Sequence, residues 1–205
     1  MLKKKIGIIN YNAGNIYSIK KSFEYLGCQV DILEDINKLK DIKYLILPGV
    51  GSFGYCVKNL LKKFYLPNFK KKIYKDRIPL LSICVGMQML GNISEESPGV
   101  EGLKFCDFNV FRMKEKRTLK LPHVGWNDVI FKKNFGDFKK NGKYDFYFDH
   151  SYIIQENKFC IGSTVHTEKF CSIIQSKNIL ACQFHPEKSQ ENGISFLKNF
   201  LDFYA

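Results

Sequence analysis

The sequence lacks the features that mark membrane or secreted proteins. Within its 205 residues, no apolar run approaches the roughly 18 to 20 residues that a membrane-spanning helix needs. The amino-terminal lysines lead directly into a short strand-like segment and not into the apolar core of a signal peptide. These absences predict a soluble, cytoplasmic protein with no membrane partner.

The sequence also has no CxxC pair, although it contains seven cysteines. An odd number of irregularly spaced thiols indicates neither a disulfide framework nor a zinc site, so we expect no bound metal. Most of these thiols are expected to be small core residues. The cysteines are Cys28, Cys56, Cys84, Cys106, Cys160, Cys171 and Cys182. The open question is whether one of them lies where a thiol can react.

Arginine is scarce, since only Arg77, Arg112 and Arg117 occur. The net charge of +12 therefore comes mostly from lysine, which recognises phosphates and bases less specifically than arginine. The lysines are scattered in short runs without a basic tail, a pattern typical of a solvated surface. We expect no nucleic-acid partner, and a basic nucleic-acid-binding module stays as a remote alternative.

The composition, with 45% hydrophobic and 15% aromatic residues, provides for one substantial core. The length is too short for two ordinary domains, so we expect a single domain spanning residues 1–205. Continuous apolar segments alternate with helical patterns in the first half of the chain. They predict strands at residues 6–9, 28–33, 44–47 and 78–83, and helices at 16–26 and about 52–75. This alternation predicts an α/β fold with a doubly wound, mostly parallel sheet flanked by helices.

From Phe105 to about Cys182 the segments become short, aromatic and β-branched. We expect antiparallel strands added to the parallel sheet in this region. They are predicted at residues 107–111, 127–131, 144–148, 160–165, 171–174 and 179–183. Apolar residues at helical spacing between Gly193 and Ala205 predict a closing helix.

The end of the strand at 78–83 carries the strongest chemical signal. In open α/β sheets, sites form where parallel strands end and helices begin. There the apolar strand ends at Cys84, and Gly86 two residues later allows a helix to start at once, which is typical of a nucleophile elbow. The exposed N–H groups at the start of that helix favour a thiolate, and the N–H of Val85 could donate to an oxyanion. The alternative interpretation is an unreactive core cysteine.

The neighbouring strand ends at Pro48-Gly49-Val50-Gly51. Its two glycines let the backbone turn an N–H toward a bound ligand, as the second donor of an acyl-transfer site. By itself, this loop is also compatible with a plain turn at a strand end.

A thiol nucleophile needs a base, and the sequence has four histidines. His185 is the best candidate because it follows the strand at 179–183, and Glu187 could orient its imidazole. His123 and His150 stay open as alternatives. His166 lies in a polar turn and is expected at the surface.

These residues carry a family resemblance. Residues 83–88 together with His185-Pro186-Glu187 resemble the Cys-His-Glu glutaminase domain of class I glutamine amidotransferases. Within that class the chain is similar to the glutaminase subunits of imidazole glycerol phosphate synthase. The supporting segments are residues 11–15, 48–54, 122–127, 150–152 and 185–190, and the resemblance extends from residue 6 to about residue 200.

The resemblance implies a role for each matching residue and implies no cofactor. Cys84 would attack the side-chain amide of L-glutamine, His185 would transfer the proton to the departing ammonia, and Glu187 would hold His185. The N–H of Val85 and the loop formed by Gly49, Val50 and Gly51 would form the oxyanion hole. The residues that would hold the glutamine are Gln88, His150, Ser151 and Tyr152.

The resemblance also implies a protein partner, because free ammonia is lost in water. The partner in the family is a (β/α)8-barrel cyclase that forms a heterodimer with the glutaminase and makes imidazole glycerol phosphate. The positions that match the family interface are Asn15, Trp126, Tyr147 and Lys188. An acidic face on the barrel would suit the +12 charge of this chain.

The chain departs from the family pattern at a few positions. Ser82 stands where a glycine is usual, and Asp149 stands where a valine is usual; the segment 165–171 also lacks the usual Tyr-Gly. We expect a slightly altered elbow and an active site. The acceptor of the ammonia stays open between histidine biosynthesis and an amidotransferase that makes acetamidino sugars for surface glycans. A cysteine hydrolase or peptidase using the same elbow is a further alternative.

Overall fold

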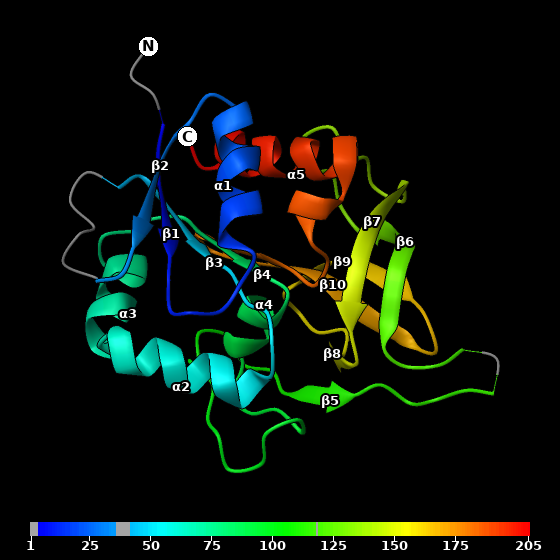
Figure 1. Cartoon of the computed structure of the whole chain (residues 1–205). Helices are drawn as coiled ribbons and strands as arrows, with labels where there is room; N and C mark the ends of the chain where they lie inside the picture. The colour runs from blue at the N-terminus through cyan, green and yellow to red at the C-terminus, as the bar shows by residue number, and fades with distance from the viewer. Residues whose placement is uncertain (1–3, 36–41, 118) are drawn as a thin grey trace.

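The computed structural model describes residues 4–35, 42–117 and 119–205. A mixed sheet forms its centre, and helices lie on both of its faces (Figure 1). In the described part of the chain, the sheet has nine strands in the order β2-β1-β3-β4-β11-β10-β9-β6-β7. The expected α/β fold with a flanked sheet is confirmed.

Five strands at one side of the sheet are parallel. They are β1 (Lys5–Ile9), β2 (Gln29–Leu33), β3 (Tyr44–Leu47), β4 (Leu80–Ile83) and β11 (Ile179–Cys182). All residues of β3, β4 and β11 are buried, which explains their continuous apolar sequences. The carboxyl ends of these three neighbouring strands therefore lie side by side at one edge of the sheet.

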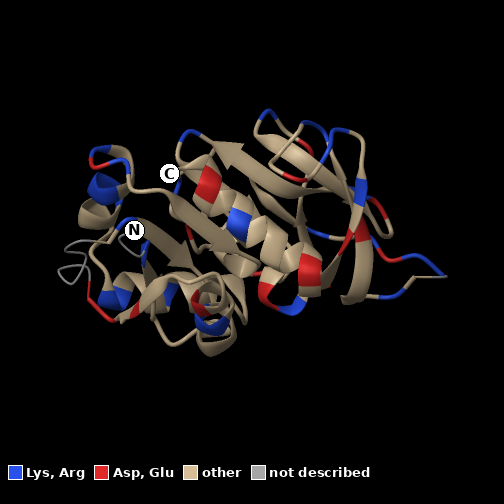
Figure 2. Cartoon of the chain, turned by 90° about the horizontal axis from the view of Figure 1, so that it is seen from above, with Lys and Arg blue, Asp and Glu red and all other residues tan. Residues whose placement is uncertain are grey.

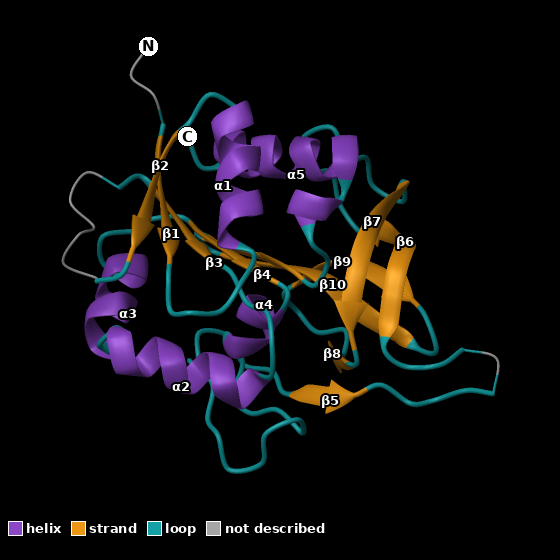
Figure 3. Cartoon of the chain, viewed as in Figure 1, coloured by secondary structure: helices purple, strands orange, loops and turns teal. Residues whose placement is uncertain are grey.

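The other side of the sheet is antiparallel. It contains β10 (Lys169–Ser176), β9 (Cys160–Val165), β6 (His123–Phe131) and β7 (Lys143–His150). Strands β6 and β7 pair over eight positions, from His123 opposite His150 to Ile130 opposite Lys143. This long hairpin rises beside the carboxyl ends of the parallel strands (Figure 3).

Helices α1 (Ile16–Tyr25) and α5 (Gln190–Phe203) cover one face of the sheet. Helices α2 (Phe53–Lys63), α3 (Leu66–Tyr74) and the short α4 (Val85–Met89) lie on the other face. A 3-10 turn, η2 (Pro186–Lys188), connects β11 to α5. The three layers bury one continuous apolar core.

The helix expected at about 52–75 is two helices. Phe64 and Tyr65 adopt extended backbone angles between α2 and α3. Pro67 is the reason, because it has no N–H to donate and its ring would clash with the carbonyl of Lys63 in a continuous helix. The prediction of one helix over this range is therefore wrong.

Two of the strands expected to be antiparallel additions also differ. Strand β11 is antiparallel to β10 but parallel to β4, so the 179–183 segment completes the parallel half of the sheet. The 107–111 segment supplies β5 (Val110–Arg112), which pairs with β8 (Tyr152–Ile154) in a separate two-stranded sheet. Alternation of apolar residues predicts a strand but carries no information on its partner or direction.

The charged residues are spread over loops, helices and strands without one basic segment (Figure 2). The ion pairs in the described chain are mostly between partly exposed side chains, such as Lys198 with Asp202 at 2.8 Å. Exposed pairs of this kind contribute little to stability. No helix within residues 4–35, 42–117 and 119–205 is long and apolar enough to cross a membrane.

Candidate functional site

Cys84 lies in the sharp turn between β4 and α4. Its φ of 55° and ψ of −116° place a non-glycine residue in a region that costs roughly 1–3 kcal/mol and persists only where the surroundings impose it. Its N–H donates to the carbonyl of Cys182 on β11 at 2.8 Å, which fixes the turn to the neighbouring strand. The expected nucleophile elbow is present.

The loop at 48–51 packs directly on this elbow. A Cβ added to Gly86 would lie 2.3 Å from the carbonyl oxygen of Leu47, and one added to Gly49 would lie 2.2 Å from the nitrogen of Gly86. The hydroxyl of buried Tyr11 donates to the carbonyl of Pro48 and holds the loop from the other side. Glycine at both positions allows the two strand-end turns to touch.

Ser82, the departure from the family glycine, is completely buried on β4. Its hydroxyl has no hydrogen-bond partner within the described chain, a cost of roughly 1–3 kcal/mol. The elbow nevertheless forms, with Ser82 paired to Leu47 on β3 and to Ala181 on β11.

His185 and Glu187 lie at the carboxyl end of β11, next to the elbow. Nδ1 of His185 lies 2.9 Å from Oε1 of Glu187, and the two side chains are 4% and 1% exposed. The backbone of His185 is held on both sides: its N–H donates to the Tyr147 carbonyl at 2.8 Å, and its carbonyl accepts from the Ser189 hydroxyl at 2.6 Å. The imidazole is therefore fixed in position and orientation.

The electrostatics of His185 favour its charged form. Burial lowers its pKa, but the charge of Cys84, a hydrogen bond to Cys84 and the hydrogen bond and charge of Glu187 outweigh burial and raise the pKa to about 10. A protonated imidazole between a cysteine sulfur and a carboxylate is the arrangement expected of a nucleophile with its proton donor.

A pocket of about 210 Å³ opens above Cys84. The residues that line it come from separate segments of the chain: Val50, Gly51, Cys84, Val85, Asp149, His185 and Lys188. The structure thus brings together the elbow, the glycine loop and the His185 turn that the sequence pointed to. Asp149 and Lys188 bring opposite charges to the lining.

The four residues expected to hold the substrate are not among the residues that line the pocket. They are Gln88, His150, Ser151 and Tyr152. The side-chain nitrogen of Gln88 donates to the Tyr152 carbonyl at 3.1 Å and to Gln183 at 2.9 Å. His150 is buried, with Nδ1 3.0 Å from the same carbonyl, and the Ser151 carbonyl accepts from the N–H of Met113. Their role toward glutamine stays a prediction.

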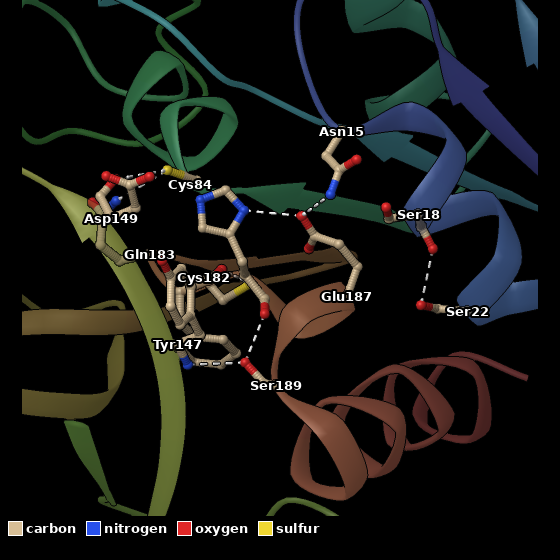
Figure 4. A network of polar contacts seen from close by, with 12 residues as sticks. Asn15, Ser18, Ser22, Cys84, Tyr147, Asp149, Cys182, Gln183, Glu187 and Ser189 are labelled. Atoms are coloured by element: carbon tan, nitrogen blue, oxygen red, sulfur yellow. Dashed lines mark hydrogen bonds and ion pairs between the residues drawn. The ribbon is translucent and has the colours of Figure 1, made fainter. Parts of the chain in front are cut away.

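The expected interface residues divide into two groups. Asn15 donates to Oε1 of Glu187 at 3.4 Å, so it contacts the His185–Glu187 pair directly (Figure 4). The other three residues form a cluster that we call the aromatic–lysine cluster; they are Trp126, Tyr147 and Lys188. Trp126 packs edge-on against Tyr147 with centroids 6.3 Å apart, and Nζ of Lys188 lies 5.2 Å from the Tyr147 ring centre. Trp126 is 46% exposed, an unusual exposure for an indole.

Gln183 is a residue that the sequence analysis missed. It is completely buried, and its side-chain nitrogen lies 3.7 Å from Sγ of Cys84. The carbonyl oxygen of Asp149 lies 3.9 Å from the same sulfur. Its position in the sequence could have pointed to the site, because Gln183 directly follows β11 and lies at the same end of the sheet as His185.

His123 and His150, the alternative bases, pair with each other and not with Cys84. Nδ1 of His123 lies 3.0 Å from Nε2 of His150. Burial lowers the pKa of His123 to about 4 and that of His150 to about 3, and neighbouring histidines act in the same direction. His166, expected at the surface, is half-buried because its ring stacks on His123 at 4.2 Å. His185 is therefore the residue positioned as the base.

We expect the protein to lose stability as the pH falls from about 6.5 towards 4, because the unfolded chain protonates its histidines in that window while His123 and His150 stay neutral when folded. The neutral His123–His150 pair stabilises the folded state fully above pH 6.5. On acidification this stabilisation is lost, and the loss is on the order of 3 kcal/mol of unfolding free energy for one ring. Urea unfolding at pH 7 and at about pH 4.5 measures it. His123→Asn, which removes one titrating ring, should show a smaller decline, and an equal decline would contradict the assignment.

An elbow cysteine beside a His–Glu pair at the carboxyl ends of parallel strands is the arrangement typical of enzymes that act through a cysteine nucleophile. The family model described as Glutamine amidotransferase class-I matches residues 7–203. The chain is 43% identical over 203 residues to imidazole glycerol phosphate synthase subunit HisH of Methanocaldococcus jannaschii, covering 96% of this chain and 98% of that one. It is 41% identical to the subunit of the same name from Caldanaerobacter subterraneus, covering 95% and 96%.

The chain therefore belongs to the class-I glutamine amidotransferases, and within them to the family of imidazole glycerol phosphate synthase HisH subunits. It is a glutamine amidotransferase. The fold agrees: PurLQS from Thermotoga maritima superposes with a TM-score of 0.77 at 17% identity, with both chains covered completely.

Proposed function

We propose that this protein is a glutaminase subunit that hydrolyses L-glutamine and passes the ammonia to a (β/α)8-barrel cyclase making imidazole glycerol phosphate in histidine biosynthesis. The observation that carries the proposal is the line of contacts from Cys84 through His185 to Glu187 beside the pocket. The names of the relatives support the histidine acceptor over the acetamidino-sugar acceptor.

The reaction follows from this geometry. The Cys84 thiolate attacks the side-chain carbonyl carbon of glutamine, and the carbonyl oxygen becomes an oxyanion. His185 gives its proton to the amide nitrogen, the carbon–nitrogen bond breaks, and ammonia leaves a glutamyl thioester. Neutral His185 then takes a proton from water, which attacks the thioester and releases glutamate. Glu187 keeps the imidazole in one orientation through both steps.

The oxyanion requires N–H donors in the pocket. The N–H of Val85 stands at the start of α4, and Val50 and Gly51 of the 48–51 loop line the same pocket. Gly51 has a φ of 112°, a conformation that glycine adopts readily, so this part of the loop can reorient its peptides. Glutamine would be held by the backbone of His150-Ser151-Tyr152 and by the side-chain oxygen of Gln88.

The partner would dock on the aromatic–lysine cluster. Lys188 both lines the pocket and lies over Tyr147, while Trp126 is exposed next to them. Aromatic residues at an exposed surface are typical anchors of an interface. Asn15, one residue before α1, connects the same region to Glu187. A barrel placed here would receive ammonia at the mouth of the pocket.

We expect the full chain alone to release glutamate slowly and to accelerate at least about tenfold when mixed with its barrel cyclase, since docking would complete the oxyanion hole. Glutamate release with and without the cyclase measures the effect. Trp126→Ala should weaken this activation while leaving the slow basal rate, whereas Tyr65→Ala, which removes an exposed aromatic on the α2–α3 connection, is the matched control. Full activation of the Trp126 variant would place the partner elsewhere.

A further inference from the structure

A buried chain of hydrogen bonds begins at Asn127 on β6. The side-chain nitrogen of Asn127 lies 3.0 Å from Nε2 of His123, and Nδ1 of His123 lies 3.0 Å from Nε2 of His150. Nδ1 of His150 lies 3.0 Å from the carbonyl oxygen of Tyr152. Both imidazoles are less than a tenth exposed.

The direction of each bond in this chain is determined. A carbonyl can only accept, so His150 donates from Nδ1 to Tyr152 and, as a neutral ring, accepts at Nε2. His123 then donates from Nδ1 and accepts from Asn127 at Nε2. The Asn127 amide is itself fixed, because its nitrogen also donates to the Val165 carbonyl at 3.1 Å. Each ring therefore has one tautomer.

The series of hydrogen bonds continues from Tyr152 to the nucleophile. Gln88 uses both hydrogens of its nitrogen, one to the Tyr152 carbonyl at 3.1 Å and one to Oε1 of Gln183 at 2.9 Å. The oxygen of Gln183 thus faces Gln88, and its nitrogen faces Sγ of Cys84 at 3.7 Å. An N–H donor aimed at a buried sulfur favours one rotamer of the side chain.

We propose that Gln183 is a positioning residue that holds the Cys84 sulfur ready for attack, and that His123 and His150 act through Tyr152 and Gln88 to hold Gln183. The proposal rests on the proposed function, in which Cys84 is the nucleophile. The carboxamide contributes orientation, because Cys84 has a single side-chain torsion and a misplaced nucleophile loses rate without losing substrate binding.

Gln183→Met keeps the length and removes both the donor toward Cys84 and the acceptor of Gln88, which keeps its bond to Tyr152. We expect kcat for glutamate release by the full chain to fall about 10- to 100-fold while KM changes by less than about twofold. Alkylation of Cys84 by 6-diazo-5-oxo-norleucine should slow similarly and still reach one label per chain. Gln175→Met, which replaces a glutamine on β10 that donates to Tyr204, should behave as wild type.

A raised KM with unchanged kcat, or rates within about twofold of wild type, would overturn the proposal. Two variants of His123 test the end of the hydrogen-bond series that lies farthest from Cys84. His123→Asn retains a donor toward His150 and should keep most of kcat, whereas His123→Leu removes it and should lower kcat in the same way as Gln183→Met. Equal kcat values for these two variants would also overturn it.

These outcomes are distinguishable from a failure of the proposed function. An active Cys84→Ser variant would show that Cys84 is not the nucleophile, whatever Gln183 does. An inactive Cys84→Ser variant together with a fully active Gln183→Met variant would refute only the positioning role.

Discussion

Replacing Cys84 by serine is expected to lower glutamate release by about 10⁴-fold or more, because removing the nucleophile of a catalytic set costs about as much as removing the whole set. A serine hydroxyl is not ionised near neutral pH, whereas the thiol is placed against the imidazolium of His185. The substitution is nearly isosteric, so the elbow and the pocket should keep their shape. Glutamate formed per chain, measured with and without the cyclase, gives the result.

The control is a second buried cysteine outside the site. Cys106→Ser should leave the rate unchanged, since burial raises the pKa of Cys106 to about 11 and keeps that thiol protonated. In the wild-type chain, 6-diazo-5-oxo-norleucine should label Cys84 and none of the other six cysteines. Glutamate release that survives in Cys84→Ser, or label spread over several cysteines, would remove the basis for the mechanism.

The parts of the site that the sequence predicted are those set by local geometry. A strand that ends at Cys84 with Gly86 two residues later has few conformations available other than an elbow. The 48–51 loop was found because it follows a buried strand of the parallel half. His185 was found because it follows the strand at 179–183, which was expected to be antiparallel and is parallel to β4. The ends of parallel strands converge at one edge of a sheet whatever the intervening chain does.

The parts that the sequence could not predict depend on long-range pairing. Gln183 and Gln88 are 95 residues apart in the chain and meet only because β11 lies beside β4. The His123–His150 contact likewise exists only in the observed register of β6 with β7, since a one-residue slip would turn one ring to the opposite face. Asn15 was assigned to the interface from the family resemblance. Its contact with Glu187, 172 residues away in the chain, is one that the sequence alone could not predict.

The second large effect concerns stability. Gly86→Ala is expected to lower the free energy of unfolding by about 3 kcal/mol or more. This is the upper end of the stability losses that overpacking against rigid structure causes. The added Cβ would lie 2.3 Å from the carbonyl oxygen of Leu47. Leu47 pairs with Ser82 in the ladder between β3 and β4, so the carbonyl cannot retreat without breaking that ladder. Urea unfolding measures the loss.

Gly7→Ala is the matched control, because it also adds one methyl group to a buried glycine at an equally short distance. Its Cβ would lie 2.5 Å from Cδ1 of Leu33, the far end of a side chain that can rotate away, so it should cost less than about half as much. Gly86→Ala should also slow the labelling of Cys84, whereas Gly7→Ala should not. Equal stability losses would show that the contact between the two strand-end turns is not what holds the elbow. Because this contact sets the position of the 48–51 loop beside Cys84, Gly86 also determines where the proposed second oxyanion donor lies.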